Sequence, residues 1–127
     1  MPTTEILTVT ASDDLVVTRD VEPVDVHEDH QGRWEIVVRP PPTGVLIEFQ
    51  AATGVLFQNP SYRSRTAMPR WLSWILSSPT GFVLQVSPRT KDEARRWEFW
   101  IEYQIVGEDR PPARRRVDPI IVCDPIT

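Results

Sequence analysis

The stretch Arg96-Trp97-Glu98-Phe99-Trp100-Ile101-Glu102-Tyr103-Gln104-Ile105-Val106 decides the fold class. Large apolar side chains occupy every second position from Trp97 to Ile105, and mostly polar residues alternate with them. A period of two is typical of a β-strand that packs one face against a core. We therefore predict one long, half-buried strand over Arg96–Val106, which Gly107-Glu108-Asp109 should end as a turn.

Short segments of the same kind continue on both sides of this stretch. They are Ile6–Thr10, Leu15–Thr18, Arg33–Arg39, Val45–Gln50, Val55–Phe57, Trp71–Leu76, Phe82–Val86 and Ile120–Cys123, and Val21–Val26 extends or follows the second of them. Two neighbouring pairs, around Ser12-Asp13-Asp14 and around Ser77–Gly81, have the spacing of hairpins. A single helical turn is conceivable only over Thr90–Trp97. About eight or nine short strands predict an all-β fold, specifically an immunoglobulin-like antiparallel β-sandwich.

The composition agrees with one globular domain over residues 1–127. Apolar residues make up 40% of the chain, and a chain of this length buries roughly two-thirds of its surface on folding. Cys123 is the only cysteine, so an internal disulfide is excluded. The start Met1-Pro2-Thr3-Thr4-Glu5 lacks the basic and apolar regions of a signal peptide, and no apolar run is long enough to span a membrane. We expect a cytoplasmic protein without a membrane partner.

Charge is distributed unevenly along the chain. Residues 1–50 contain ten acidic residues and three arginines, whereas residues 51–127 contain eleven basic and eight acidic residues. Only Lys91 among the basic residues is a lysine. The planar guanidinium of arginine suits carboxylate pairing and interfaces, although genomic base composition explains such a bias equally well.

Two segments contain the residues that could support metal or nucleophile chemistry. Asp25-Val26-His27-Glu28-Asp29-His30 holds both histidines beside three carboxylates, and these residue types suit zinc, manganese or iron. On extended backbone, however, Asp25, His27 and Asp29 share one face and His30 lies on the other, so a solvated polar turn is the favoured interpretation. A nucleophilic Cys123 would need one of these histidines as its base, and we expect a buried structural thiol instead.

Basic side chains and tryptophans provide the remaining candidates. Arg63 and Arg65 flank Ser64, and Arg114-Arg115-Arg116 forms a second basic run, but the acidic pI of 5.1 makes nucleic acid an unlikely partner. If the strands Trp71–Leu76 and Arg96–Val106 share a sheet, its second face carries Trp71, Ile75, Trp100 and Val106. Such a patch marks a partner or ligand surface, unless the loop Asn59–Pro69 covers it.

The chain from Trp71 onward resembles a loose group of small bacterial β-sandwich proteins. The resemblance rests on a hairpin like Trp71–Val86, an alternating strand like Trp97–Val106 and the ending Asp118-Pro119-Ile120-Ile121-Val122. It covers about 55 residues. It implies an immunoglobulin-like sandwich and no particular activity.

We therefore predict a non-catalytic protein-interaction module without a cofactor, acting as an adaptor or as a subunit of a larger bacterial assembly. Its interacting residues are expected to be Trp71, Ile75, Trp100, Val106, Arg63 and Arg65, with another protein or a second copy as partner. One alternative is a ligand-binding sandwich that stacks carbohydrate on Trp71 and Trp100. Another is a small metal-dependent protein that uses His27 and His30.

Overall fold

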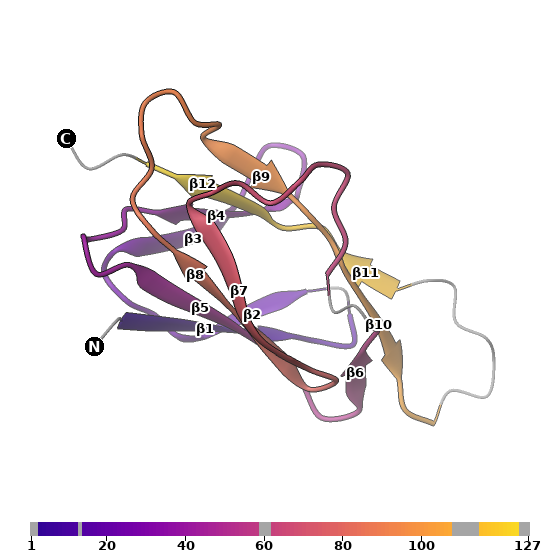
Figure 1. Ribbon diagram of the computed structural model, residues 1–127. Helices are drawn as coiled ribbons and strands as arrows, with labels where there is room; N and C mark the ends of the chain where they lie inside the picture. Colours follow the sequence, from indigo (N-terminus) through magenta and orange to yellow (C-terminus); the bar gives the residue numbers. More distant parts are fainter. Residues whose placement is uncertain (1–2, 13, 59–61, 108–114, 125–127) are drawn as a thin grey trace.

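The computed structural model describes residues 3–12, 14–58, 62–107 and 115–124. These residues form twelve β-strands and no helix, which confirms the predicted all-β class (Figure 1). The strands are β1 (Thr3–Val9), β2 (Leu15–Arg19), β3 (Val24–Glu28), β4 (Trp34–Val38), β5 (Val45–Ala51), β6 (Val55–Phe57), β7 (Leu72–Ser78), β8 (Gly81–Val86), β9 (Arg96–Glu98), β10 (Ile101–Ile105), β11 (Arg115–Val117) and β12 (Ile120–Cys123). Within the described ranges, no helix is long and apolar enough to cross a membrane.

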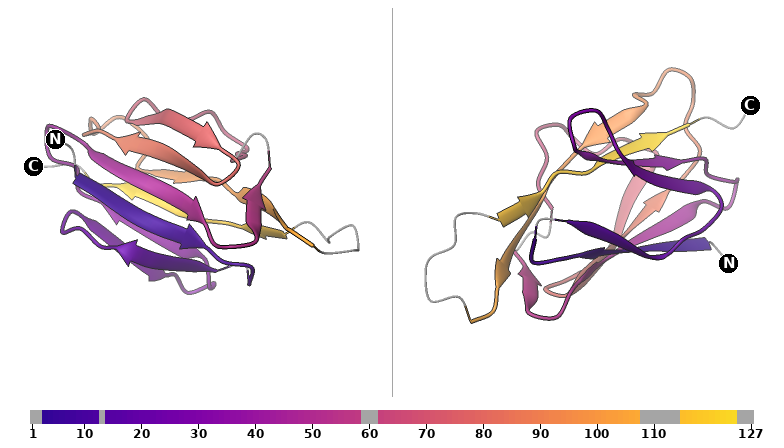
Figure 2. Two further views of the ribbon diagram at one scale, coloured as in Figure 1. Left: turned by 90° about the horizontal axis from the view of Figure 1, so that it is seen from below. Right: turned by 180° about the vertical axis from the view of Figure 1, so that it is seen from behind.

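Three sheets share the strands. A five-stranded sheet has the order β2-β1-β5-β8-β7, a four-stranded sheet the order β3-β4-β12-β9, and a three-stranded sheet the order β11-β10-β6. The five-stranded and four-stranded sheets form two layers, and the three-stranded sheet lies toward one end (Figures 1 and 2). Strand β1 runs parallel to β5, and β12 runs parallel to β4. The prediction of purely antiparallel pairing is therefore wrong, because alternation within a strand says nothing about which distant segment becomes its neighbour.

The stretch Arg96–Val106 does not form one continuous strand. It bends at Phe99-Trp100, so that β9 pairs with β12 in the four-stranded sheet and β10 pairs with β11 in the three-stranded sheet. The partner segment bends at the same level, at Asp118-Pro119, where proline has no N–H for the ladder. The backbone N–H of Phe99 donates to the carbonyl oxygen of Pro119 at 3.3 Å and ties the two bends together.

The inward face predicted for this stretch is confirmed, except that Ile105 at its end is only partly buried, although it packs against the core. Trp97, Phe99, Ile101 and Tyr103 are all buried, with at most 2% of their surface exposed. The ring of Phe99 stacks on Trp97 at 4.8 Å and meets the edge of Phe49 from the five-stranded sheet at 5.9 Å. The alternating aromatic residues thus join the two layers through the core.

Other local predictions have mixed outcomes. Both hairpins are confirmed, because β1 pairs with β2 and β7 pairs with β8 in antiparallel fashion. The single helical turn predicted over Thr90–Trp97 is wrong, because this segment contains a turn and then enters β9.

The polar turn expected at Asp25–His30 is also wrong in part, since β3 extends to Glu28 and the turn begins only after it. The turn expected at Gly107-Glu108-Asp109 lies mostly outside the described residues.

Candidate functional site

A cleft of about 550 Å³ opens beside the paired bends of β9–β10 and β11–β12. Its described lining comes from segments far apart in the sequence: Arg33, Arg65, Thr66, Arg96, Glu98, Phe99, Trp100, Arg116, Asp118, Pro119 and Ile120. The hollow lies where both segments, β9–β10 and β11–β12, leave the four-stranded sheet at the same level. The volume lies in the range of pockets that bind small molecules or peptide side chains.

The cleft faces outward from the four-stranded sheet. In the ladder, Ile120 of β12 lies between Glu35 of β4 and Glu98 of β9, so these three side chains share one face. Ile120 is buried, yet it does not belong to the main core cluster between the layers. Ile120 is therefore buried on the outer face of the sheet, where it is one of the residues that line the cleft.

Arginine dominates the charge of the cleft. Four arginines line it against two carboxylates, those of Glu98 and Asp118. Arg33 donates to Glu98 at 3.2 Å, Arg96 lies 3.7 Å from the same carboxylate, and Arg116 lies 3.4 Å from Asp118. Arg65 is exposed and forms no ion pair with any described residue. The cleft thus has an excess of positive charge in a chain whose net charge is −4.

Trp100 is held at the bend in a defined orientation. Its indole N–H donates to a carboxylate oxygen of Glu102 at 3.1 Å, and its backbone exchanges two hydrogen bonds of 2.8 Å with Arg63. The guanidinium of Arg63 lies 3.4 Å from Glu102, whose side chain is only 15% exposed. The guanidinium of Arg116 lies 5.6 Å from the indole centroid, within cation–π distance. These contacts fix an aromatic surface beside the arginines.

This set of side chains is suited to binding. Guanidinium groups remain protonated in proteins and present a planar fork of donors that matches carboxylates. The ion pairs at Arg96 and Arg116 involve side chains about half exposed, so each is weak and can exchange for another carboxylate. An anionic ligand could therefore replace existing partners without leaving a buried charge unpaired.

Only two of the predicted interaction residues meet in the cleft, Trp100 and Arg65. Arg63 does not line the cleft, but it positions Trp100 through its backbone hydrogen bonds and through its ion pair with Glu102. Ile75, on β7, and Val106, at the end of β10, are 46% and 61% exposed but lie in different sheets. The predicted shared face with Trp71, Ile75, Trp100 and Val106 does not exist, because β7 and β10 belong to different sheets.

Trp71 requires a separate correction, since it belongs to the core. It is 2% exposed, and its indole N–H donates to the carbonyl oxygen of Ala94 at 2.8 Å. The backbone N–H of Ser87 also donates to its carbonyl oxygen at 2.7 Å. Trp71 lies just before β7, where the segment after β8 covers it, and it therefore cannot act with Trp100 as a stacking platform.

The candidate metal residues lie on β3 and in the turn that follows. His27 is 3.5 Å from both Asp25 and Glu35, and His30 is exposed in the turn. Asp29 accepts hydrogen bonds of 2.9 Å from the backbone N–H groups of Arg33 and Gln31, and the bond from Arg33 lowers the pKa of its carboxyl group. In the described part of the chain, no three His, Cys, Asp or Glu side chains form a metal-binding group. The turn instead positions Arg33 at the cleft, where Asp29 lies 3.4 Å from its Nε.

Cys123 is completely buried at the end of β12. Burial raises the pKa of its thiol to about 11, and Sγ lies 3.5 Å from the carbonyl oxygen of Ser87. A thiol with a raised pKa carries little of the reactive thiolate at neutral pH. Its position is that of a packing residue.

Five charged cleft residues were not among the predicted interaction residues: Arg33, Arg96, Glu98, Arg116 and Asp118. Two of them had a usable signal, because alternation places Arg96 and Glu98 on the same outward face as Trp100. Arg33 carried no local signal, and Arg116 was noted only as part of the basic run Arg114-Arg115-Arg116, because only the strand pairing brings these segments to the bend. Sequence comparison adds nothing to these assignments: no family model, no curated protein and no solved structure matches the chain.

Proposed function

We propose that this protein is a non-catalytic protein-interaction module, which binds an acidic segment of a partner protein in the arginine-lined cleft. Trp100 would contact the apolar part of that segment, and the guanidinium groups of Arg65, Arg96 and Arg116 would pair with its carboxylates. Aromatic and arginine side chains are the residues most often found at the energetic centre of protein interfaces. The fold would serve as an immunoglobulin-like sandwich scaffold, an assignment supported by two packed layers of short strands.

One observation carries the proposal: an acidic chain concentrates four arginines around a fixed, partly exposed tryptophan. A protein with net negative charge repels acidic partners in general, so a local excess of arginine selects where such a partner can bind. A cleft lined by one sign of charge also focuses the field and accelerates association. The arrangement therefore favours an acidic peptide over a neutral one.

A short glutamate-rich peptide with one central leucine is a suitable probe. We expect saturable binding by isothermal titration calorimetry, and weaker binding as salt concentration rises. Trp100→Ala should weaken binding by at least about 2 kcal/mol, the usual threshold for an interface hot spot. The Arg65→Ala variant should weaken binding less, because an exposed charge at the rim contributes little.

Two controls make this experiment decisive. Arg70→Ala removes an exposed arginine outside the cleft and should leave binding unchanged. Denaturant unfolding of Trp100→Ala separates lost binding from lost folding. If a lysine-rich peptide of equal length binds as well as the glutamate-rich one, or if Trp100→Ala binds normally, the proposed function is wrong.

A further inference from the structure

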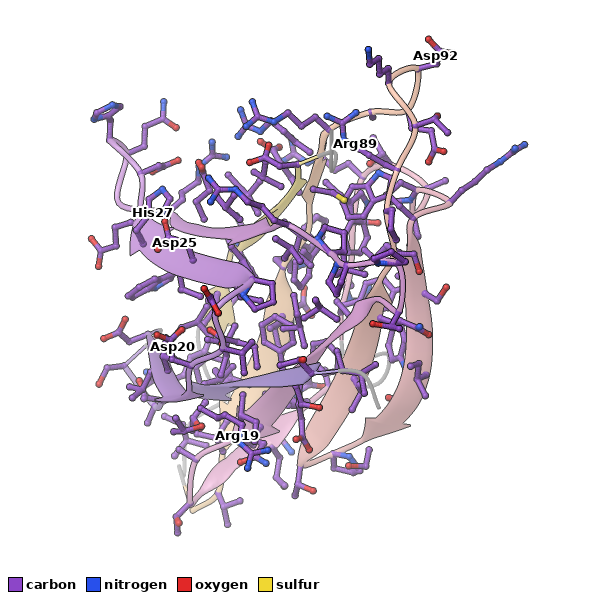
Figure 3. All side chains as sticks on the ribbon, turned by 90° about the vertical axis from the view of Figure 1, so that its left-hand side faces the viewer. Arg19, Asp20, Asp25, His27, Arg89 and Asp92 are labelled. Carbon is purple, nitrogen blue, oxygen red and sulfur yellow. The ribbon has the colours of Figure 1, made fainter. Side chains whose placement is uncertain are left out.

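An acidic surface lies along β3 and the corner before it. Between Arg19 and Arg33 the chain contains five acidic residues and neither lysine nor arginine. Four of them, Asp20, Glu22, Asp25 and Glu28, are exposed, and the side chain of Asp25 is 77% exposed. Figure 3 shows Asp20 and Asp25 on the same flank of the molecule, with His27 beside Asp25. We call these four residues the acidic flank.

Asp25 of the acidic flank and Arg96 of the cleft lie at opposite edges of one sheet, although the cleft also reaches Arg33 in the turn after β3. The four-stranded sheet has the order β3-β4-β12-β9, so β3 and β9 are its two edge strands. Its register places Asp25, Val37, Val122 and Arg96 in one row across the outer face. That row begins with a carboxylate at one edge and ends with a guanidinium at the other.

This arrangement is complementary between two copies of the chain. When one copy is placed beside another with the same orientation, the β3 edge of the first faces the β9 edge of the second. The acidic flank then approaches the cleft arginines, and the like-charged surfaces stay apart. A two-fold axis through either edge would instead oppose like charges, acid to acid or arginine to arginine, and like-charge contacts are costly at interfaces.

We propose that a second copy of this chain is an occupant of the cleft, with the acidic flank of one copy docked against Arg96 and Arg116 of the next. This inference rests on the proposed function and names its partner. In this side-by-side arrangement the contact is heterologous, because each copy turns a different edge toward each neighbour, and each added copy presents a free flank and a free cleft. Association should therefore continue beyond a dimer, depend on concentration and weaken with salt.

Sedimentation velocity with two charge-reversal variants tests this inference. The first, Arg96→Glu with Arg116→Glu, disrupts the cleft, and the second, Asp25→Lys with Glu28→Lys, disrupts the flank. All four side chains are exposed, so folding should be retained, which denaturant unfolding of both variants checks. Each variant alone should self-associate at least about a hundredfold more weakly than the wild type. An equimolar mixture should restore association beyond a dimer, because the acidic flank of the first variant meets the cleft arginines of the second, and the reversed flank of the second meets the reversed cleft of the first.

The outcomes separate this inference from the proposed function. The control Arg70→Glu reverses an exposed charge outside the cleft and should associate like the wild type. A wild type that stays monomeric at high concentration, forms only a closed dimer, or yields folded variants that do not pair would overturn the inference. The flank variant retains its cleft and can therefore still be tested for binding of the glutamate-rich peptide. If it binds the peptide while the wild type stays monomeric, the proposed function is supported and only the inference of self-association is wrong.

Discussion

Replacing Phe99 with alanine should lower the free energy of unfolding by roughly 3–5 kcal/mol, the range measured for large core aromatics. Phe99 is 2% exposed, stacks on Trp97 at 4.8 Å and meets Phe49 of the opposite layer at 5.9 Å. It also lies at the bend where the chain passes from β9 to β10. The substitution would therefore leave a cavity at the point that joins the two layers. Urea unfolding monitored by tryptophan fluorescence would measure the change.

The matched control lies on the same stretch. Gln104 alternates outward from β10 and is exposed, so Gln104→Ala should change stability by no more than about 0.5 kcal/mol. Glu102 is unsuitable as a control, because it accepts the indole hydrogen bond of Trp100. Equal shifts of the urea midpoint in Phe99→Ala and Gln104→Ala would contradict the assignment of Phe99 to the core.

Glu5 should make stability depend on pH. Among the described residues it is the only charged side chain that is completely buried, and it accepts a hydrogen bond of 2.7 Å from the backbone N–H of Val21. Burial, and secondarily the negative charge of Asp20, raises the pKa of Glu5 to about 7. The pKa of glutamate in the unfolded chain is about 4.3. At pH values between these two pKa values, the folded state therefore holds a proton that the unfolded chain has already released.

The sign of the effect follows from this difference in proton binding. Below about pH 4 both states bind the proton and the full stability contribution of Glu5 is present. As pH rises toward and beyond 7, a contribution of roughly 3 kcal/mol is lost, because a tenfold difference in proton affinity between the two states corresponds to about 1.4 kcal/mol. Glu5→Gln keeps the acceptor for Val21 but cannot ionise, so it should stabilise the protein by about 1–3 kcal/mol at pH 8 and change little at pH 4.

Urea unfolding of Glu5→Gln at the two pH values measures this effect. Glu22→Gln is the control, because Glu22 is exposed at the nearby corner and should give the same small change at both values. A Glu5→Gln variant that is less stable than the wild type at pH 8 would show that the carboxylate is favourably ionised in the fold. The buried-acid account of Glu5 would then be wrong.

Much of the fold could be predicted because burial repeats every second residue. The alternation of Arg96–Val106 correctly gave the buried side chains, and short polar breaks correctly gave both hairpins. The parallel pairs β1–β5 and β4–β12 could not be predicted, because the hydrophobic pattern of a strand is the same whichever neighbour it takes. The bend at Phe99-Trp100 could not be predicted for a related reason. The alternation of apolar residues continues through the bend, and only the change of pairing partner marks it.

The site was predicted less completely than the fold. Trp100 was correctly placed off the inward face, since the apolar positions around it were already filled. Trp71 was misplaced because alternation was extended one residue before β7 begins, into a position that the segment near Ala94 covers. Ser73 and Ile75, which lie within β7, are exposed as the alternation requires. The cleft itself depends on Arg33, Arg65, Arg96 and Arg116 coming from separate segments, and no pattern within any one of them indicates this.

The central claim is that an acidic segment binds at Trp100, and the indole N–H resonances test it most directly. In a titration of ¹⁵N-labelled protein with the glutamate-rich peptide, the indole signal of Trp100 should shift saturably, because its hydrogen bond to Glu102 and its contact with Arg116 lie at the cleft. The indole signal of Trp71 serves as an internal reference and should stay fixed, since it is buried against Ala94. A Trp100 signal that does not move when the peptide binds, or that moves no more than that of Trp71, would contradict the account.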